Sequence, residues 1–275
     1  MTVAEALAQA RVRIAPSEAK LLLRHVLGCT AVDIAAYPER MLDESLSSRY
    51  AELIARRAAG EPIAYLLGVR EFFGRNFCVT PAVLIPRPET ELLVEVALAK
   101  LGDMARPRIL DLGAGSGCVA ITLALEANAD VTAADISTDA LAVARDNAAR
   151  LGASVNFIES DWFSAVAGKF DLIVGNPPYI VEGDAHLAQG DLRFEPPQAL
   201  ASGADGLDAI RRIVAEASRH LVAGGWLFLE HGYDQAEAMR ALLTEAGFTS
   251  IEQHRDLAGI VRVSAGRLDG PTAAR

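Results

Sequence analysis

The segment Asn176-Pro177-Pro178-Tyr179 is the stretch of the sequence whose residue types point most directly to chemistry. A residue before proline is pushed out of the helical region and each proline fixes its own φ, so this backbone is stiff and extended. The carboxamide oxygen of Asn176 and the carbonyl of Pro177 can each accept one N–H of a flat NH₂ group. We therefore predict a positioning device for such a group, with Tyr179 as the wall of its pocket. The alternative is a proline-rich loop with a capping Asn.

The chemistry that this device serves is attack by a poor nucleophile. An amide or exocyclic amine is unreactive because its lone pair is delocalised, as the ~18–20 kcal/mol barrier to peptide C–N rotation shows. Accepting both hydrogens stabilises the developing positive charge, so no strong general base is required, and alignment adds effective molarities of up to ~10⁵–10⁸ M. The motif leaves the acceptor open, because the amino groups of adenine and cytosine have the same geometry as a glutamine amide.

A glycine-rich turn, Gly113-Ala114-Gly115-Ser116-Gly117, follows a strand-like apolar run and precedes a helical pattern. Missing side chains let a ligand approach the backbone. With Ala120 and with Asp135 at the right distance for ribose hydroxyls, the turn also satisfies a loose dinucleotide fingerprint, so by itself it does not exclude NAD. A tight turn with an ordinary helix cap is the alternative without function.

Asp111 and the extra Gly113 extend the turn to Asp-x-Gly-x-Gly-x-Gly, which resembles the class I S-adenosylmethionine-dependent methyltransferases. In that family the turn packs along the methionine moiety, and an acidic residue that ends the second strand binds the ribose. The resemblance gives these roles to residues 113–117 and to Asp135. Trp162 stands where the family places residues beside the adenine, although a core aromatic is an equally good interpretation.

The elements that must position these residues divide the chain into three parts. Residues 1–72 show apolar positions at three- and four-residue spacing, which predicts a helical N-terminal domain, and we expect it to dock the substrate. Residues 73–88, with aromatic residues, glycine and prolines, predict a hairpin and connector. Residues 89–275 predict a Rossmann-like α/β domain with a mainly parallel, doubly wound sheet. The expected strands are Arg108–Leu112, Val131–Asp135, Val155–Ile158, Phe170–Gly175 and Trp226–Glu230.

Composition limits the classes of function. The 275 residues carry a formal net charge of −10, so the surface as a whole repels phosphate backbones, and a nucleic-acid substrate is not expected. Membrane contact is not expected either, because no apolar run is long enough to span a bilayer. The three cysteines contain no Cys-x-x-Cys pair, which argues against a structural metal site. Without a signal-type or membrane-spanning run, the chain is expected to be cytoplasmic. Residues 270–275 are expected to be frayed.

Along its whole length the chain resembles the bacterial release factor glutamine methyltransferases. The resemblance is carried by five separated motifs: Gly60-Glu61-Pro62-Ile63-Ala64-Tyr65, Ile85-Pro86-Arg87-Pro88-Glu89-Thr90-Glu91, Asn176-Pro177-Pro178-Tyr179, Arg193-Phe194-Glu195-Pro196 and Glu230-His231-Gly232. It implies methyl transfer from S-adenosylmethionine, leaving S-adenosylhomocysteine, to the glutamine of the Gly-Gly-Gln motif in class I peptide chain release factors. Ala114 and Ser116 stand where relatives often carry threonine, which leaves the backbone of the turn unaffected.

The resemblance also implies roles for single residues. Asn176 would face both ligands, with Pro177, Pro178 and Tyr179 completing the acceptor site. Arg87 would either contact the protein partner or pair with a carboxylate such as Glu91. Two rival functions remain open, namely an amino methyltransferase acting on nucleic acid and a non-catalytic cofactor-binding interaction protein.

Overall fold

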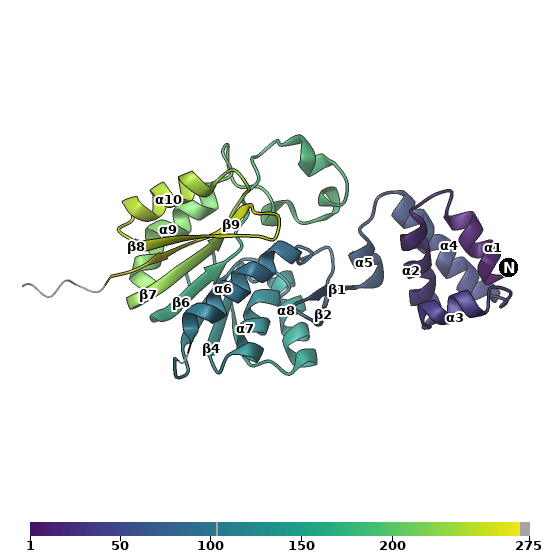
Figure 1. Cartoon of the computed structure of the whole chain (residues 1–275), viewed down its shortest axis with the longest axis horizontal. Helices are drawn as coiled ribbons and strands as arrows, with labels where there is room; N and C mark the ends of the chain where they lie inside the picture. The colour runs from purple at the N-terminus through teal and green to yellow at the C-terminus, as the bar shows by residue number, and fades with distance from the viewer. Residues whose placement is uncertain (103, 270–275) are drawn as a thin grey trace, which may run out of the picture. The chain divides into compact units, whose positions relative to one another are not determined.

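The computed structural model describes residues 1–102 and 104–269, so the expected fraying of residues 270–275 lies outside the described part (Figure 1). The chain divides into two compact units. The N-terminal unit comprises Met1–Val69 together with Gln189–Phe194, and the second unit, called here the catalytic unit, takes the rest.

The N-terminal unit is a helical bundle, as predicted. Thr2 caps the first helix through a capping box with Glu5. Pro16 is the first residue of the next helix, which ends at Gly28 in the left-handed region. Buried Leu22, Leu23 and Leu53 are among the residues that form its core. Its helices are α1 (Val3–Ala10), α2 (Pro16–Leu27), α3 (Ala31–Ala36), α4 (Glu44–Ala58) and α5 (Ile63–Leu67).

The short segment Gln189–Phe194, far away in the sequence, belongs to this unit and was not anticipated by any sequence pattern. It contains the 3₁₀ turn η3 (Leu192–Phe194). Asp191 accepts a hydrogen bond of 3.0 Å from Arg57 of α4, and Arg193 donates to the carbonyl of Ala59. Two ion-pairing or charge-assisted contacts thus tie the segment to the end of one helix.

The catalytic unit is built on a seven-stranded sheet in the order β5-β4-β3-β6-β7-β9-β8. Strands β5 to β7 of this order are parallel, and β9 runs antiparallel to both of its neighbours. The strands are β3 (Arg108–Leu112), β4 (Asp130–Asp135), β5 (Val155–Glu159), β6 (Phe170–Gly175), β7 (Leu221–Glu230), β8 (Thr249–Arg255) and β9 (Val261–Arg267). The mainly parallel α/β sheet expected from the sequence is confirmed.

Alternating residues of the strands supply a core on each face of the sheet, because successive side chains point to opposite faces. Ile109 and Phe228 belong to one core, and Leu110 and Leu227 belong to the other. The first core is shared with α6 (Glu91–Leu101), α7 (Cys118–Glu126) and α8 (Thr138–Leu151), and the second with α9 (Asp208–His220) and α10 (Ala236–Glu245). Figure 1 shows the two groups of helices with the sheet between them.

The predicted hairpin is present as β1 (Val69–Phe72) and β2 (Arg75–Cys78). Its two-residue turn has φ values of 50° at Phe73 and 72° at Gly74, which are the positive values that a tight hairpin turn with the right twist requires. Phe72 and Phe77 are fully buried in the core on the α6 side of the sheet. The hairpin is thereby fixed to the catalytic unit.

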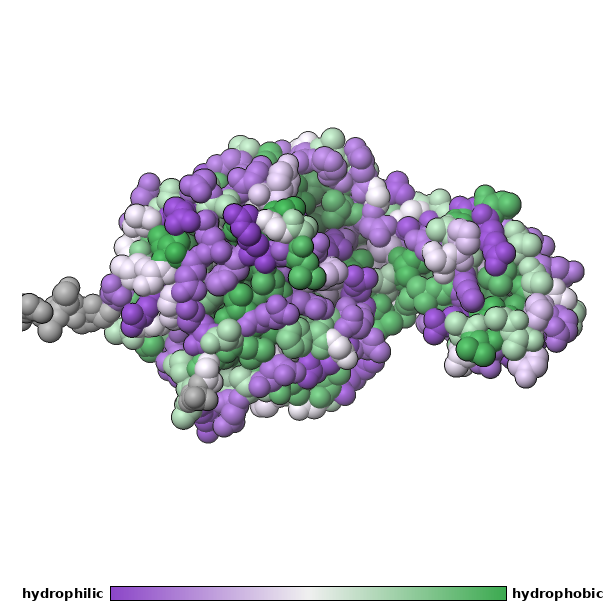
Figure 2. Space-filling model, viewed as in Figure 1, coloured by the Kyte–Doolittle hydropathy of each residue, from purple (hydrophilic) through white to green (hydrophobic). Residues whose placement is uncertain are grey.

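Large exposed apolar side chains occur in both units. Figure 2 shows hydrophilic residues over much of the drawn face of each unit, with apolar ones between them. Large exposed apolar side chains include Val12 and Met41 in the N-terminal unit and Ile136 and Tyr233 in the catalytic unit. Within residues 1–102 and 104–269, no helix is both long and apolar enough to cross a membrane.

Candidate active site

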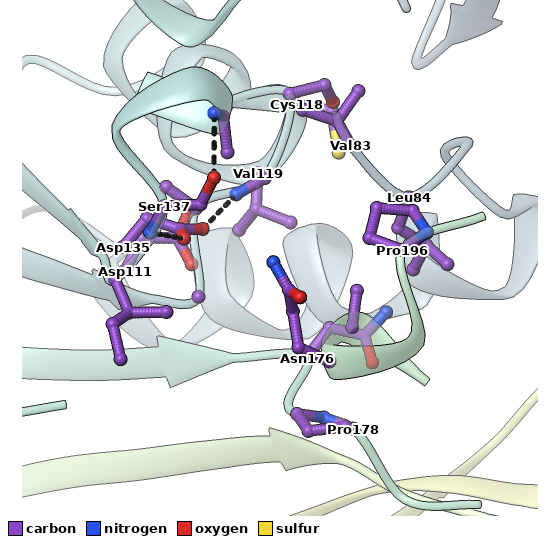
Figure 3. Close-up of a pocket in the computed structure, with 18 of the residues that line it drawn as sticks. Val83, Leu84, Asp111, Cys118, Val119, Asp135, Ser137, Asn176, Pro178 and Pro196 are labelled. Carbon is purple, nitrogen blue, oxygen red and sulfur yellow. Dashed lines mark hydrogen bonds between the residues drawn. The ribbon is translucent and has the colours of Figure 1, made fainter. Parts of the chain in front are cut away.

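A cavity of about 270 Å³ lies in the catalytic unit at the carboxyl ends of the parallel strands. The order of the strands reverses between β3 and β6, and open α/β sheets bind ligands at such a switch point. Figure 3 shows Asn176 projecting into this space, with Asp135 on one side and Leu84 and Pro196 on another. Sequence-predicted residues that line the cavity are Arg87, Gly113, Ala114, Gly115, Ser116, Asp135, Trp162, Asn176 and Pro178.

The glycine turn joins β3 to α7 as expected. Gly113, Gly115 and Gly117 have φ values of 77°, 53° and 79°, a region that side-chain-bearing residues avoid. At Gly117 an added Cβ would also lie 2.8 Å from the Ile121 side chain, so glycine is required there for packing. Gly117 is the N-cap of α7, and it is the one member of the turn that does not line the cavity.

Asp111 is a structural support of the turn. Its side chain is buried, and Oδ2 accepts a hydrogen bond of 3.1 Å from the backbone N–H of Ala120 in the first turn of α7. Burial raises the pKa of this carboxyl to about 7, partly opposed by that hydrogen bond. A carboxylate at a helix N-terminus satisfies a backbone donor that has no partner within the helix.

Asp135 ends β4 and faces the cavity. Its two carboxyl oxygens accept hydrogen bonds of 2.8 Å from the backbone N–H groups of Gly115 and Ser137 (Figure 3). Burial nevertheless raises the pKa of the carboxyl, against these two bonds. The carboxyl is thus fixed in direction, while each oxygen keeps further acceptor capacity for a ligand hydroxyl.

Trp162 follows β5 and lines the cavity with a backbone φ of 50°. A Cβ added at Gly113 would lie 3.7 Å from the Trp162 ring, so the indole stands against the bare backbone of the glycine turn. The side chain is only half-buried. It therefore forms part of the cavity wall as well as packing against the core on the α9 side.

The segment 176–179 is anchored at the end of β6 by polar contacts on both sides. Nδ2 of Asn176 donates to Oγ1 of Thr90 at 3.1 Å. The Tyr179 hydroxyl donates to Oε1 of Glu230 at 3.3 Å. Asn176 and Pro178 line the cavity, whereas buried Pro177 and half-buried Tyr179 do not. The role expected for Tyr179 as a wall of the acceptor pocket stays a prediction, and its hydroxyl is held at the end of β7.

The opposite side of the cavity is closed by two segments far apart in sequence, residues 82–87 and 196–199. Glu195, whose side chain is fully buried, joins them: its carboxylate accepts a hydrogen bond of 2.9 Å from Ile85 N–H and pairs with the Arg87 guanidinium. Arg87 therefore does not pair with Glu91, which instead accepts a hydrogen bond from Phe73 N–H in the hairpin. Pairing with a carboxylate was one of the two alternatives expected for Arg87, and the carboxylate is Glu195 rather than the suggested Glu91.

Asn147 is a further residue that the sequence did not indicate. It is fully buried on α8. Its Nδ2 donates to the carbonyls of Ser116 and Cys78, each at 2.9 Å, and its Oδ1 accepts from Cys78 N–H at 2.7 Å. The amide thus links the glycine turn to the last residue of the hairpin.

His231 and Cys118 are reactive residue types that the site does not use as catalysts. His231 is buried, and its ring nitrogens contact Gly232 O and Ser264 Oγ, each at 2.9 Å, while burial lowers its pKa. Burial raises the pKa of the Cys118 thiol to about 12. Across the described part of the chain, no three His, Cys, Asp or Glu side chains gather as a metal site.

Both units match known protein families. Residues 2–68 match the family described as PrmC N-terminal domain, and residues 88–203 match the methyltransferase small domain. Solved structures with the same fold include a methyltransferase from Pyrococcus furiosus, with a TM-score of 0.56 and 21% identity over 80% of this chain and 100% of that one. A second is a 16S rRNA methyltransferase from T. thermophilus in complex with AdoMet and guanosine, with a TM-score of 0.55 and 22% identity over 73% of this chain and 49% of that one.

Similarity to curated proteins is closer. The release factor glutamine methyltransferase of Bordetella pertussis is 53% identical, over 91% of this chain and 94% of that protein. The protein of the same name from Burkholderia pseudomallei is 52% identical over 92% of each chain. The chain described here belongs to the release factor glutamine methyltransferase family.

Proposed function

We propose that this chain transfers a methyl group from S-adenosylmethionine to the side-chain amide nitrogen of the glutamine in the Gly-Gly-Gln motif of class I peptide chain release factors, in the cytoplasm. The observation that carries the proposal is the position of Asn176. It lies at the carboxyl end of β6 on the same cavity as the glycine turn and Asp135, so one cavity presents a donor site and an amide-holding group together.

The residues present fit the methyl donor. Gly113 and Gly115 offer bare backbone, and Asp135 has acceptor capacity for the ribose hydroxyls. Ser116 also lines the cavity, and its buried Oγ makes no hydrogen bond of standard geometry, although it lies near the Cys118 thiol. Trp162 presents an aromatic face suited to the adenine. When bound, S-adenosylmethionine supplies a methyl group made electrophilic by its positive sulfur.

The part of this chain in the chemistry is to hold the acceptor. The Nδ2 group of Asn176 is occupied by Thr90, which leaves Oδ1 as the end of the carboxamide that can accept an N–H of the glutamine. In this proposal the carbonyl of Pro177, which stands between the cavity-lining residues Asn176 and Pro178 without lining the cavity itself, accepts the second N–H. The stiff proline backbone fixes the distance between the two acceptors. Both acceptors stabilise positive charge on the nitrogen as it attacks, and Pro178 lines the cavity beside them.

The surrounding residues exclude water and recruit the partner. The segments joined by Glu195 cover the cavity, which limits competition from water during transfer. We assign the N-terminal helices to docking of the release factor, and Arg87 to contact with it or with the donor through the part of its guanidinium that Glu195 leaves free.

The test is methyl transfer to a purified release factor, using S-adenosylmethionine labelled in its methyl group. Label should appear in the Gly-Gly-Gln glutamine and vanish when that glutamine is replaced by alanine. Asn176→Ala should slow transfer by ~10²-fold or more, the scale observed when one preorganised polar group is lost. Label that persists after the glutamine is replaced, or that enters DNA or RNA instead, would refute the assignment of the acceptor.

A further inference from the structure

Two buried residues, Thr90 and Glu230, lie next to the segment that carries Asn176, and of these Thr90 also lines the cavity. Thr90, at the junction of η1 (Pro88–Thr90) and α6, is 3% exposed, and its Oγ1 accepts the 3.1 Å hydrogen bond from Asn176 Nδ2. Glu230, the last residue of β7, is 1% exposed. Its Oε1 is occupied by the Tyr179 hydroxyl, whereas its Oε2 makes no hydrogen bond of standard geometry. Thr90 nonetheless lies close enough to hydrogen-bond this carboxyl and so to lower its pKa.

Chemistry constrains which group donates and which accepts between Asn176, Thr90 and Glu230. A threonine hydroxyl has one hydrogen to donate and two lone pairs that accept. An ionised carboxylate can only accept, so a hydrogen bond between Thr90 and Glu230 requires the Thr90 hydroxyl to donate, which leaves the lone pairs of that hydroxyl for its other neighbour. That neighbour must then donate, and the donor end of the Asn176 carboxamide is Nδ2. The opposite end, Oδ1, is left to face an acceptor amide.

The reverse order has the opposite consequence. If Glu230 carried a proton and donated it to Thr90, the Thr90 hydroxyl would be free to donate to Asn176. The carboxamide would then turn its oxygen towards Thr90 and its NH₂ group towards the cavity. Two N–H groups would face each other at the acceptor site, which cannot hold a glutamine amide. One proton at a buried position therefore decides which end of Asn176 is presented.

We propose that Thr90 and Glu230 are positioning residues that set the orientation of the Asn176 carboxamide, through hydrogen bonds in which Asn176 Nδ2 donates to Thr90 and Thr90 donates to the Glu230 carboxylate. The inference rests on the proposed function, because it concerns the group that holds the acceptor. It goes beyond that function by assigning two residues that touch neither ligand's reacting atoms. It also predicts that transfer requires Glu230 in its ionised form.

The surroundings of Glu230 determine how this requirement depends on pH. The pKa of Glu230 is raised to about 7, mainly by burial and also by the negative charge of Glu89, against the hydrogen bonds from Thr90 and Tyr179 and the charge of Arg262, which lower it. The Cys118 thiol also faces the carboxyl but stays protonated, since its own pKa is raised to about 12. The kcat of the wild-type enzyme should therefore fall as the pH drops through the region near 7.

The first experiment measures kcat and KM for release-factor methylation at saturating S-adenosylmethionine in Thr90→Val and Thr90→Ser. Valine keeps the shape and removes the hydroxyl, so kcat should fall by about five- to tenfold, the change expected when the hydrogen bond that selects an orientation is lost. Serine should restore most of that loss. A fall of less than about twofold in Thr90→Val, or an equal fall in both variants, would overturn the proposal.

A double-mutant cycle separates positioning from general damage. If Thr90 acts only through Asn176, then Thr90→Val should not slow an enzyme that already carries Asn176→Ala. Additive losses would show that Thr90 acts elsewhere and would overturn the inference. The matched control is Ser264→Ala on β9, which removes another fully buried hydroxyl, one that is hydrogen-bonded to His231. This variant should keep kcat within about twofold of the wild-type value.

The pH profile tests Glu230. In Glu230→Gln, which keeps size but cannot ionise, the fall in kcat on the acid side should disappear between about pH 6 and pH 8. A fall that persists in this variant would refute the role of its carboxylate. The wild-type enzyme and Asn176→Ala are measured first: absence of label in the wild-type glutamine means that the proposed function has failed. Normal wild-type transfer with an unchanged Thr90→Val means that only the positioning by Thr90 and Glu230 has failed.

Discussion

Replacing Asn147 by alanine should destabilise the catalytic unit severely although Asn147 touches no predicted ligand. The side chain makes three hydrogen bonds of 2.7–2.9 Å, two to the backbone of Cys78 and one to the carbonyl of Ser116. Ser116 and Asn147 are both buried, whereas Cys78 is half-buried. The loss therefore falls mainly on groups that water cannot easily reach.

The magnitude follows from these three bonds. A buried polar group left without a partner costs ~1–3 kcal/mol, and water can replace only part of the bonding at Cys78. Removing the amide also leaves a small cavity under α8. We expect a total loss of about 3–5 kcal/mol in the free energy of unfolding, which is a large share of the ~5–15 kcal/mol that typically holds a domain together. Affinity for S-adenosylmethionine should fall as well, because the glycine turn loses its tether.

Urea unfolding followed by tryptophan fluorescence measures this loss selectively, because the chain has only two tryptophans and both, Trp162 and Trp226, lie in the catalytic unit. The matched control is Asp146→Ala, the exposed neighbour on the same helix, which should change stability by no more than ~0.5 kcal/mol. A loss below about 1 kcal/mol in Asn147→Ala would refute the view that this amide holds the glycine turn to the hairpin.

Three further predictions concern the donor site and pH. Asp135→Ala should weaken binding of S-adenosylmethionine in calorimetry by about 10- to 100-fold, since charged hydrogen bonds contribute ~1.5–3 kcal/mol each; an unchanged affinity would exclude contact with the ribose. The folded-state pKa of Asp111, about 7, lies above its ordinary value of 3.8, so the folded chain binds more protons between these values and the free energy of unfolding should fall as pH rises from about 4 to about 7. Asp111→Asn should flatten that slope, and a slope identical to that of the wild type would contradict the assignment. Donor binding should change the fluorescence of Trp162, so the change should vanish in Trp162→Phe and persist in Trp226→Phe; the opposite pattern would remove Trp162 from the donor site.

The parts of the fold that could be predicted from the sequence are those written in local patterns. The run Arg108–Leu112 is apolar and ends at a glycine turn, and the strand has those bounds. β7 was expected from Trp226, yet it begins at Leu221, because pairing of Leu221 with Phe170 overrides the glycines at 224 and 225. The antiparallel strands β8 and β9 were not identified individually. β8 carries polar residues on both faces at the sheet edge, so it lacks a clear alternation.

The residues of the candidate site also divide into those that a local sequence pattern indicates and those that it does not. Asn176 and the glycine turn could be found because each follows a recognisable strand directly. Glu195, Asn147 and Thr90 could not, since their bonds reach Ile85, Cys78 and Asn176 across 110, 69 and 86 positions of the chain. Glu195 and Thr90 did occur in motifs of the family resemblance, but nothing in those motifs revealed their partners. Long-range pairing of single polar groups leaves no periodic signal.

These three residues show how buried polar side chains hold the cavity in shape. Thr90 fixes the acceptor segment, Asn147 fixes the glycine turn, and Glu195 fixes the cover. Each is buried, and each bonds to another segment of the unit, so its loss exposes unpaired groups at one wall only. Substitutions at these residues should consequently have separate effects. Thr90→Val should lower kcat, whereas Asn147→Ala should lower the affinity for the methyl donor and the stability of the unit. If these effects are separate, the geometry of the site depends on its buried polar residues as well as on the sheet beneath it.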